Sequence, residues 1–184
     1  MQQRQKLVPR AEGRVLEIGI GAGPNLAFYD PQKVSALIGL EPSIGMRRKA
    51  QKAIADANIP VELIGLPSEE IPLDSNSIDT VVITYTLCTI SDYAEALSQM
   101  RRVLKPEGKL LFCEHGLSPD ENVVRWQNRL NPIWKIIGGG CNLNRPIPLL
   151  IKEAGFEIVD SETMYLDDIP KFAGFNYWGA AIPR

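Results

Sequence analysis

The chain has 184 residues and a formal net charge of −2 at pH 7. With 45% hydrophobic and 23% charged residues, its composition is that of one folded domain and excludes a disordered chain or a coiled coil. It lacks the basic run of a nucleic-acid-binding protein, the roughly 20 apolar residues of a membrane span, and a signal-peptide core. We therefore expect a single domain over residues 1–184 that neither binds nucleic acid nor spans a membrane.

Strand-like and helix-like stretches alternate along the first two thirds of the chain. Buried strands are predicted at residues 14–19, 34–41, 61–65, 78–85 and 109–115. Helices are predicted to begin at Pro24 and after Ser43, which suits a capping position, and a third helix has Tyr93, Leu97, Met100 and Leu104 on one face. Strands and helices that alternate at this spacing indicate parallel pairing through right-handed crossovers.

The last third follows another pattern. A glycine-rich loop at 138–140 and a helix near 146–154 precede two strand-like stretches, 156–166 and 172–182, with no helix between them. Two strands joined by a short loop pair antiparallel. The predicted fold is therefore α/β, with a mostly parallel sheet that carries a reversed strand towards its C-terminal edge.

Three glycines at alternate positions follow the first strand: Gly19, Gly21 and Gly23. Such a turn lets a ligand approach the backbone closely, and the carboxyl ends of parallel strands are where ligands bind in open α/β sheets. It could also serve packing alone. A dinucleotide fingerprint needs Gly-x-Gly-x-x-Gly, but Pro24 stands at the third glycine position, which disfavours a dehydrogenase.

Two carboxylates refine the choice of ligand. Glu17, just before the turn, would repel a pyrophosphate and attract a cation, and Glu41 ends the second strand where an acidic residue holds ribose hydroxyls in nucleotide-binding folds. A ligand with a ribose and positive charge but no phosphate suits both. S-adenosylmethionine, which has a ribose, an ammonium and a sulfonium, meets this description.

The same residues carry a family resemblance. "VLEIGIGAG", "IGLEPS", "LPSEEIPLDSNSIDTVV" and "RRVLKPEGKLLF" resemble, in order and spacing, the successive motifs of class I S-adenosylmethionine-dependent methyltransferases. The resemblance covers residues 14 to 115 and implies a three-layer Rossmann-like fold with an antiparallel C-terminal strand. It also implies cofactor contacts from Glu17, Gly19, Gly21, Gly23, Glu41, Pro42, Ser68, Glu69, Thr84, Tyr85 and Thr86. Pro67 stands where the family frequently has an aspartate and so departs from the pattern. Glu70, next to Glu69, is expected to be an exposed loop residue.

Further segments, "TLCTI", "EHG", "WQNRLNPIWK" and "GGGCNLNRP", resemble a subfamily that includes the vertebrate thiol S-methyltransferases. This resemblance implies a small-molecule methyl acceptor, with a thiol as the first candidate. A quinone-type, hydroxyl or carbon acceptor and a lipid amine are alternatives, as is a protein that binds the cofactor without turnover. The sequence does not indicate the oligomeric state.

His115, the single histidine, follows the fifth strand and is the candidate catalytic residue, either lining the site as a general base or anchoring a loop. Asn142 and Arg145 follow the triple glycine and are candidate acceptor-binding residues; with Asn144 they could instead satisfy backbone groups of their loop. Trp126, like Trp134 and Trp178, is expected in the core, although it could line an acceptor pocket.

The three cysteines, Cys88, Cys113 and Cys141, are far apart in the sequence and are expected to be reduced thiols of a cytoplasmic protein. Their spacing matches no zinc motif, so no metal site is expected. About 13 residues precede the first strand, fewer than the helical segment that usually covers the acceptor pocket in the family, so we expect an open site or a lid from elsewhere.

Overall fold

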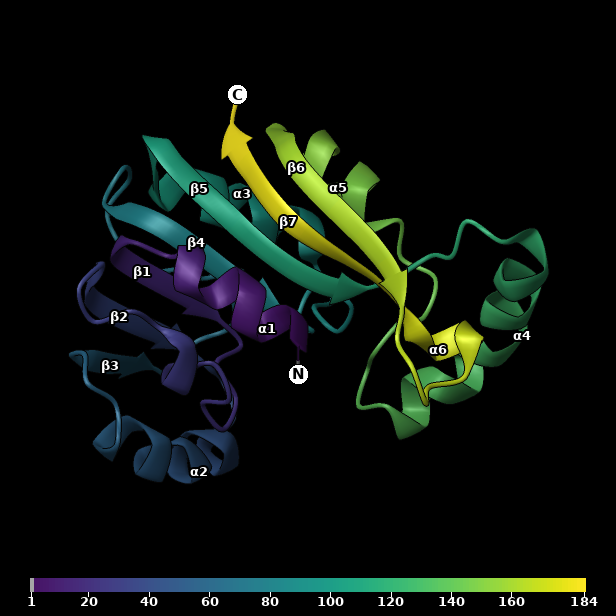
Figure 1. Cartoon of the computed structure of the whole chain (residues 1–184), viewed down its shortest axis with the longest axis horizontal. Helices are drawn as coiled ribbons and strands as arrows, with labels where there is room; N and C mark the ends of the chain where they lie inside the picture. The colour runs from purple at the N-terminus through teal and green to yellow at the C-terminus, as the bar shows by residue number, and fades with distance from the viewer. Residues whose placement is uncertain (1) are drawn as a thin grey trace.

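In the computed structural model, which describes residues 2–184, a seven-stranded sheet in the order β3-β2-β1-β4-β5-β7-β6 forms the centre of the molecule (Figure 1). The strands are β1 Gly13–Ile18, β2 Val34–Leu40, β3 Val61–Ile64, β4 Ile78–Thr84, β5 Leu104–His115, β6 Phe156–Tyr165 and β7 Phe175–Pro183. Strands β3, β2, β1, β4 and β5 pair in parallel, whereas β7 runs antiparallel to both β5 and β6. The predicted mixed sheet with one reversed strand is confirmed.

Helices cover both faces of this sheet. They are α1 Gln2–Leu7, α2 Ile44–Ala55, α3 Tyr93–Val103, α4 Glu121–Ile137, α5 Ile147–Glu153 and α6 Lys171–Gly174, with short 3-10 segments at Val8–Arg10 and Leu26–Phe28. One buried cluster joins α3 and α5 to the sheet, and a second joins α1 and α2 to the opposite face. The result is the expected three-layer arrangement, from which α4 and α6 project beyond the ends of β5 and β6 (Figure 1).

Three expectations about helices need correction. No α-helix begins at Pro24; the segment forms only the 3-10 turn Leu26–Phe28, because Asn25 and Tyr29 on either side turn their side chains inward to Glu17. Leu104 is buried as predicted, but it begins β5 rather than ending α3, since its backbone is already extended two residues before Pro106. Third, the expectation of no helix between the last two strands is wrong, because the four-residue helix α6 lies there and β7 begins only at Phe175. Helix α4 was not predicted either.

Helix α4 begins at a capping aspartate, Asp120, and contains Pro132 in its interior. It is tied to the rest of the molecule by the buried side chain of Gln127. The Gln127 amide accepts a hydrogen bond from Ser118 N (3.0 Å) and donates to the carbonyls of Gly116 (2.9 Å) and Leu143 (2.9 Å), with a longer bond to Phe172 O (3.2 Å). One side chain thus joins the segments that enter and leave the α4 region.

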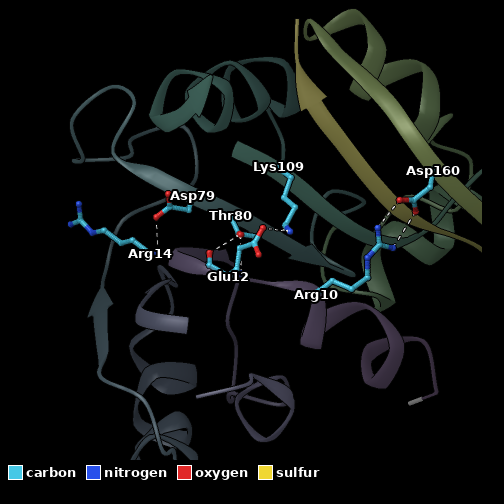
Figure 2. Close-up of polar contacts among 7 residues, drawn as sticks. All are labelled: Arg10, Glu12, Arg14, Asp79, Thr80, Lys109 and Asp160. Atoms are coloured by element: carbon cyan, nitrogen blue, oxygen red, sulfur yellow. Dashed lines mark hydrogen bonds and ion pairs between the residues drawn. The ribbon is translucent and has the colours of Figure 1, made fainter. Parts of the chain in front are cut away.

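Polar contacts hold together the amino ends of the strands, away from the edge where ligands bind (Figure 2). The hydroxyl of Thr80 on β4 donates to the carbonyl of Glu12 (2.9 Å) and accepts from the Glu12 amide (3.1 Å). The Glu12 carboxylate pairs with Lys109 on β5 (2.5 Å), and Arg10 pairs with Asp160 on β6 (2.5 Å). Such partly exposed ion pairs each contribute little stability, but together these contacts align the N-terminal segment on three strands, β4, β5 and β6.

None of the helices within residues 2–184 combines the length and the apolar character needed to cross a membrane.

Candidate cofactor pocket and the adjoining cysteine–histidine cluster

A hollow of about 320 Å³ lies at the carboxyl ends of β1, β2 and β4, where sequence and fold both place a ligand. Among the predicted cofactor contacts, Gly19, Glu41, Pro42, Ser68, Glu69 and Thr86 line it. The sequence did not single out Leu66, Thr89 and Ile90, which complete the wall, although "TLCTI" contains the last two. This pocket is the candidate cofactor site.

The three glycines of the turn have positive φ angles, between 59° and 80°, which favour glycine. They differ in what surrounds them. A Cβ on Gly19 would lie 2.5 Å from Thr86 Cγ2, and one on Gly23 would lie 2.8 Å from Leu26 Cδ1, so both serve close packing. A Cβ on Gly21 would have no neighbour nearer than 3.6 Å. The space beside Gly21 is therefore open to a ligand, while its neighbours hold the turn in shape.

Glu41 connects the second strand to this turn. Its carboxylate accepts hydrogen bonds from Gly21 N (3.1 Å) and Ser43 N (2.9 Å), one at each oxygen, and the residue is 8% exposed at the pocket wall. Each carboxylate oxygen has a further lone pair after these bonds. The two oxygens are thus fixed by backbone donors and retain capacity for two more, which is what vicinal ribose hydroxyls require.

Glu17 is placed differently, in the interior behind the turn and with 1% of its surface exposed. Its carboxyl accepts hydrogen bonds from Asn25 Nδ2 (2.9 Å) and Tyr29 Oη (2.7 Å), and Arg4 of α1 reaches Asn25 Oδ1 (2.9 Å). Burial raises the pKa of Glu17 to about 7, although the bonds from Tyr29 and Asn25 and the charge of Arg4 each lower it. The arrangement makes Glu17 a support beneath the glycine turn; direct contact with the cofactor stays a prediction.

Of the three predicted residues at the end of β4, Thr86 lines the pocket, whereas Thr84 and Tyr85 lie outside its lining and stay predicted contacts. Thr84 is buried and accepts from Asn25 Nδ2 (3.0 Å), while Tyr85 has φ of 55°, a conformation uncommon outside glycine. The buried carboxylate of Glu114 on β5 then accepts from the backbone amides of Thr86 (2.7 Å), Leu87 (3.0 Å) and Cys88 (3.3 Å). The sharp bend after β4 is therefore held by a residue that the sequence analysis did not assign.

Asn142 and Arg145, predicted as acceptor-binding residues, anchor the same segment. Asn142 donates to Cys88 O from both its backbone and its side chain, each at 2.9 Å. Arg145 donates to Leu87 O, and its guanidinium lies 4.9 Å from the centre of the Tyr93 ring. These contacts agree with the alternative in which both residues satisfy backbone groups, and an acceptor contact stays a prediction.

Ser68 and Glu69, expected on the adenine side, do lie at the pocket, and Ser68 Oγ donates to Glu69 Oε2 (3.1 Å). Trp126 lies elsewhere, on α4, beside a second hollow that Val123, Leu130 and Phe172 also line. Trp126 is 56% exposed, so its placement in the core was wrong; that of Trp178, which is 9% exposed, is confirmed. The exposure of Trp126 arises because α4 projects from the sheet.

His115 does not lie alone. Its Nε2 atom is 2.9 Å from Cys141 Sγ, and the ligating atoms of Cys88, His115 and Cys141 all lie within 4.8 Å of one another. The pKa of Cys141 is lowered to about 4, chiefly by a hydrogen bond from the Cys88 thiol and also by His115, although burial raises it. The same hydrogen bond raises the pKa of Cys88. Burial alone would lower the pKa of His115, but the bond and charge of Cys141, followed by the charge of Glu114, raise it. All three cysteines are free thiols, as expected, and Cys88 and Cys113 are buried; the meeting of Cys88 and Cys141 could not be foreseen from their spacing.

Comparison with known proteins gives the family. Residues 16–112 match the model of the family described as "Methyltransferase domain", which is more than half of the chain. The chain belongs to this methyltransferase family. S-adenosylmethionine, the methyl donor indicated by the glycine turn and the two carboxylates, is the cofactor of this methyltransferase domain.

The methyltransferase domain is similar to thiol S-methyltransferase TMT1B from Rattus norvegicus, with 34% identity over 82% of this chain and 63% of that protein. The human protein of the same name gives 34% identity over 83% of this chain and 64% of its own length. The chain thus spans less than two thirds of these relatives. Its fold matches the crystal structure of the YcgJ protein from Bacillus subtilis with a TM-score of 0.75 and 17% identity, covering 100% of this chain and 97% of that one.

Proposed function

We propose that this methyltransferase domain transfers the methyl group of S-adenosylmethionine to the sulfur of a small thiol. The observation that carries the proposal is the pocket lined by Gly19 and Glu41, whose wall residue Thr89 directly follows Cys88 of a cluster of thiol and imidazole side chains. The relatives named thiol S-methyltransferase support a thiol over the quinone-type, hydroxyl and amine acceptors, which stay alternatives.

The pocket fits the cofactor on two counts in this structure. The open space beside Gly21 admits a ligand close to the backbone, and the Glu41 carboxylate retains two acceptor positions at the wall. Glu41 would hold the ribose hydroxyls, the glycine turn would face the methionine end, and Ser68 and Glu69 would face the adenine.

S-adenosylmethionine supplies a methyl group on a sulfonium whose leaving thioether is neutral, so the chain's residues have mainly to align the acceptor and exclude water. Glu114 and Arg145 hold the wall segment at residues 86–90 in a fixed position for this purpose. A thiol acceptor, with an ordinary pKa of about 8.5, needs modest help to lose its proton. His115, at the end of β5 beside this wall, is the residue we assign to that part of the site.

Calorimetric titration of Glu41→Ala with S-adenosylmethionine and S-adenosylhomocysteine tests the cofactor half of the proposal. Loss of two hydrogen bonds to a charged acceptor should weaken binding about 10- to 100-fold. Glu62→Ala, which removes an exposed carboxylate from the neighbouring strand β3, is the matched control and should bind normally. Equal affinity of the Glu41 and Glu62 variants would remove Glu41 from the site.

The acceptor half is tested by following radioactive methyl transfer from S-adenosylmethionine to a panel that contains an alkyl thiol, a hydroquinone, a phenol and a primary amine. We expect the thiol to be methylated fastest. Faster methylation of another class would overturn the thiol assignment. Binding of both adenosyl compounds with no transfer to any acceptor would instead favour a protein that binds the cofactor without turnover.

A further inference from the structure

We propose that Cys88, His115 and Cys141 form a binding site for a thiophilic divalent cation of the Zn²⁺ class, whose fourth coordination position takes the acceptor thiol. The proposal rests on the thiol acceptor proposed above and adds the means by which that thiol is bound and activated. His115 then helps the thiol lose its proton as a ligand of the cation and not as a base. It replaces the expectation of no metal site, which considered spacing along the chain alone.

The ligand set suits zinc. Two cysteine sulfurs and one histidine nitrogen are the donors of Cys₂His sites, in which three protein ligands leave the fourth tetrahedral position open. Tetrahedral geometry with ordinary zinc bond lengths puts two sulfurs about 3.8 Å apart and a sulfur and a nitrogen about 3.6 Å apart. All three donor atoms here lie within 4.8 Å of one another, and within residues 2–184 they are the one such group of three His, Cys, Asp or Glu side chains.

A small rearrangement completes the geometry. The 2.9 Å between His115 Nε2 and Cys141 Sγ is a hydrogen-bond distance and must lengthen by about 0.7 Å to admit a cation between them. Cys141 directly follows Gly139 and Gly140, whose φ angles are 61° and 94°, and a Cβ on Gly139 would have no neighbour within 4 Å. The loop that carries Cys141 therefore has the space for this shift.

The residues next to the ligands hold one another in place. Glu114, which precedes His115, accepts from Cys88 N (3.3 Å), and Asn142, which follows Cys141, donates twice to Cys88 O (2.9 Å each). The backbone at Cys88 is thus fixed from both sides by the neighbours of the other two ligands. Such support around the ligands is characteristic of metal sites, because it orients the donors before the ion binds.

The cluster adjoins the cofactor pocket through Thr89, which lines the pocket and whose hydroxyl lies 3.5 Å from Cys88 Sγ. Cys88 is buried, but His115 and Cys141 are partly exposed, so the cluster is accessible from their side. A Cβ on Gly140 would lie 3.4 Å from Thr89 Cγ2, and Thr89 lines the cofactor pocket. A thiol bound to the cation would therefore lie beside the wall that the methyl donor faces.

The chemistry balances without an added oxidant or reductant. A thiol that coordinates the cation loses its proton to solvent and is held as a thiolate. The thiolate sulfur forms a bond to the methyl carbon as the bond between that carbon and the sulfonium breaks. The products are a methyl thioether, neutral S-adenosylhomocysteine and one released proton. The thioether is a weaker ligand than the thiolate, which favours its departure.

Cobalt substitution tests the site in the full-length chain. The metal-free reduced protein, in a buffer with a thiol-free reductant, is titrated with Co²⁺ and followed by the thiolate-to-cobalt charge-transfer band. We expect one ion per chain, and an affinity reduced at least about 10- to 100-fold in Cys88→Ser, His115→Ala and Cys141→Ser. Cys113→Ser removes the cysteine outside the cluster and should bind Co²⁺ normally. No stoichiometric band in the native chain, or equal affinity in all four variants, overturns the site.

Butanethiol is then added to the cobalt protein. An increase in the charge-transfer band, from a further thiolate, is expected; an unchanged spectrum overturns the assignment of the fourth position. Calorimetric binding of S-adenosylhomocysteine shows whether each variant retains its fold. Thiol methylation by the metal-free protein at the rate of the zinc-loaded protein overturns this inference and leaves the proposed function intact. Methylation of the thiol in neither state overturns the proposed thiol acceptor itself.

Discussion

Replacement of Glu17 by glutamine should make the protein more stable at alkaline pH and change little in mild acid. The Glu17 carboxyl is buried with Asn25 and Tyr29, and its pKa is raised from 4.5 to about 7. A carboxyl whose pKa is higher in the folded than in the unfolded state holds its proton more tightly when folded. Stability from this group is therefore complete below pH 4.5 and is lost as the pH rises through about 7.

The size of the effect follows from the shift. A rise of the Glu17 pKa from 4.5 to about 7 corresponds to about 3 kcal/mol, most of which is lost between pH 5 and pH 8.5. The amide of Glu17→Gln stays neutral, and can accept from Asn25 and donate to Tyr29. The difference in unfolding free energy between the variant and the native protein should therefore grow by about 2 to 3 kcal/mol across this range.

Guanidinium unfolding curves of both proteins, measured at intervals from pH 5 to pH 8.5, provide the assay. Glu107→Gln, which changes an exposed glutamate, is the matched control and should run parallel to the native protein. If the native and Glu17→Gln curves also stay parallel, Glu17 does not keep its proton in the folded state and the reasoning from burial is refuted.

Two further substitutions examine the pocket walls. Gly19→Ala should destabilise the fold by about 1–3 kcal/mol and weaken cofactor binding, because its Cβ would lie 2.5 Å from Thr86 Cγ2. The control is Gly139→Ala, which has a similar φ but open space around it, so it measures the free-energy cost of the backbone conformation alone. Equal unfolding free energies for the two glycine variants would contradict this argument from packing. Arg145→Ala removes the donor to Leu87 O and should speed amide hydrogen exchange at residues 86–90 several-fold by mass spectrometry, whereas unchanged exchange would show that this bond does not hold the segment.

The sheet was predictable because strand signals are local. The strands from β1 to β5 each contain an apolar run that ends at a glycine or a polar residue. The two adjacent strand-like stretches near the C-terminus sufficed to predict the reversed strand, although the four-residue helix α6 between β6 and β7 was missed. Helix α4 was not predicted because Pro132 and its mixture of exposed isoleucines and polar residues obscure the helical period. Its stability comes from Gln127 and its neighbours, which are contacts between segments that no local pattern reveals.

The part of the candidate site formed by the glycine turn and by the end of β2 was predictable, whereas the part formed by contacts between distant side chains was less so. Glycines and a carboxylate at a strand end have a fixed spacing, so Gly19 and Glu41 could be placed at the pocket. His115 and Cys141 are 26 residues apart and come from the end of β5 and a loop after α4, so only the folded chain brings them to 2.9 Å. Glu114 is missed for the same reason, since its partners are backbone amides of the segment that follows β4.

Gln127 also links the fate of four places in the chain. Its single amide bonds to Gly116, Ser118, Leu143 and Phe172, so the segment before α4, the loop that carries Cys141, and α6 share one anchor. A change at this one side chain would therefore loosen all of these segments together, whereas a change in any one of them would leave the other bonds in place.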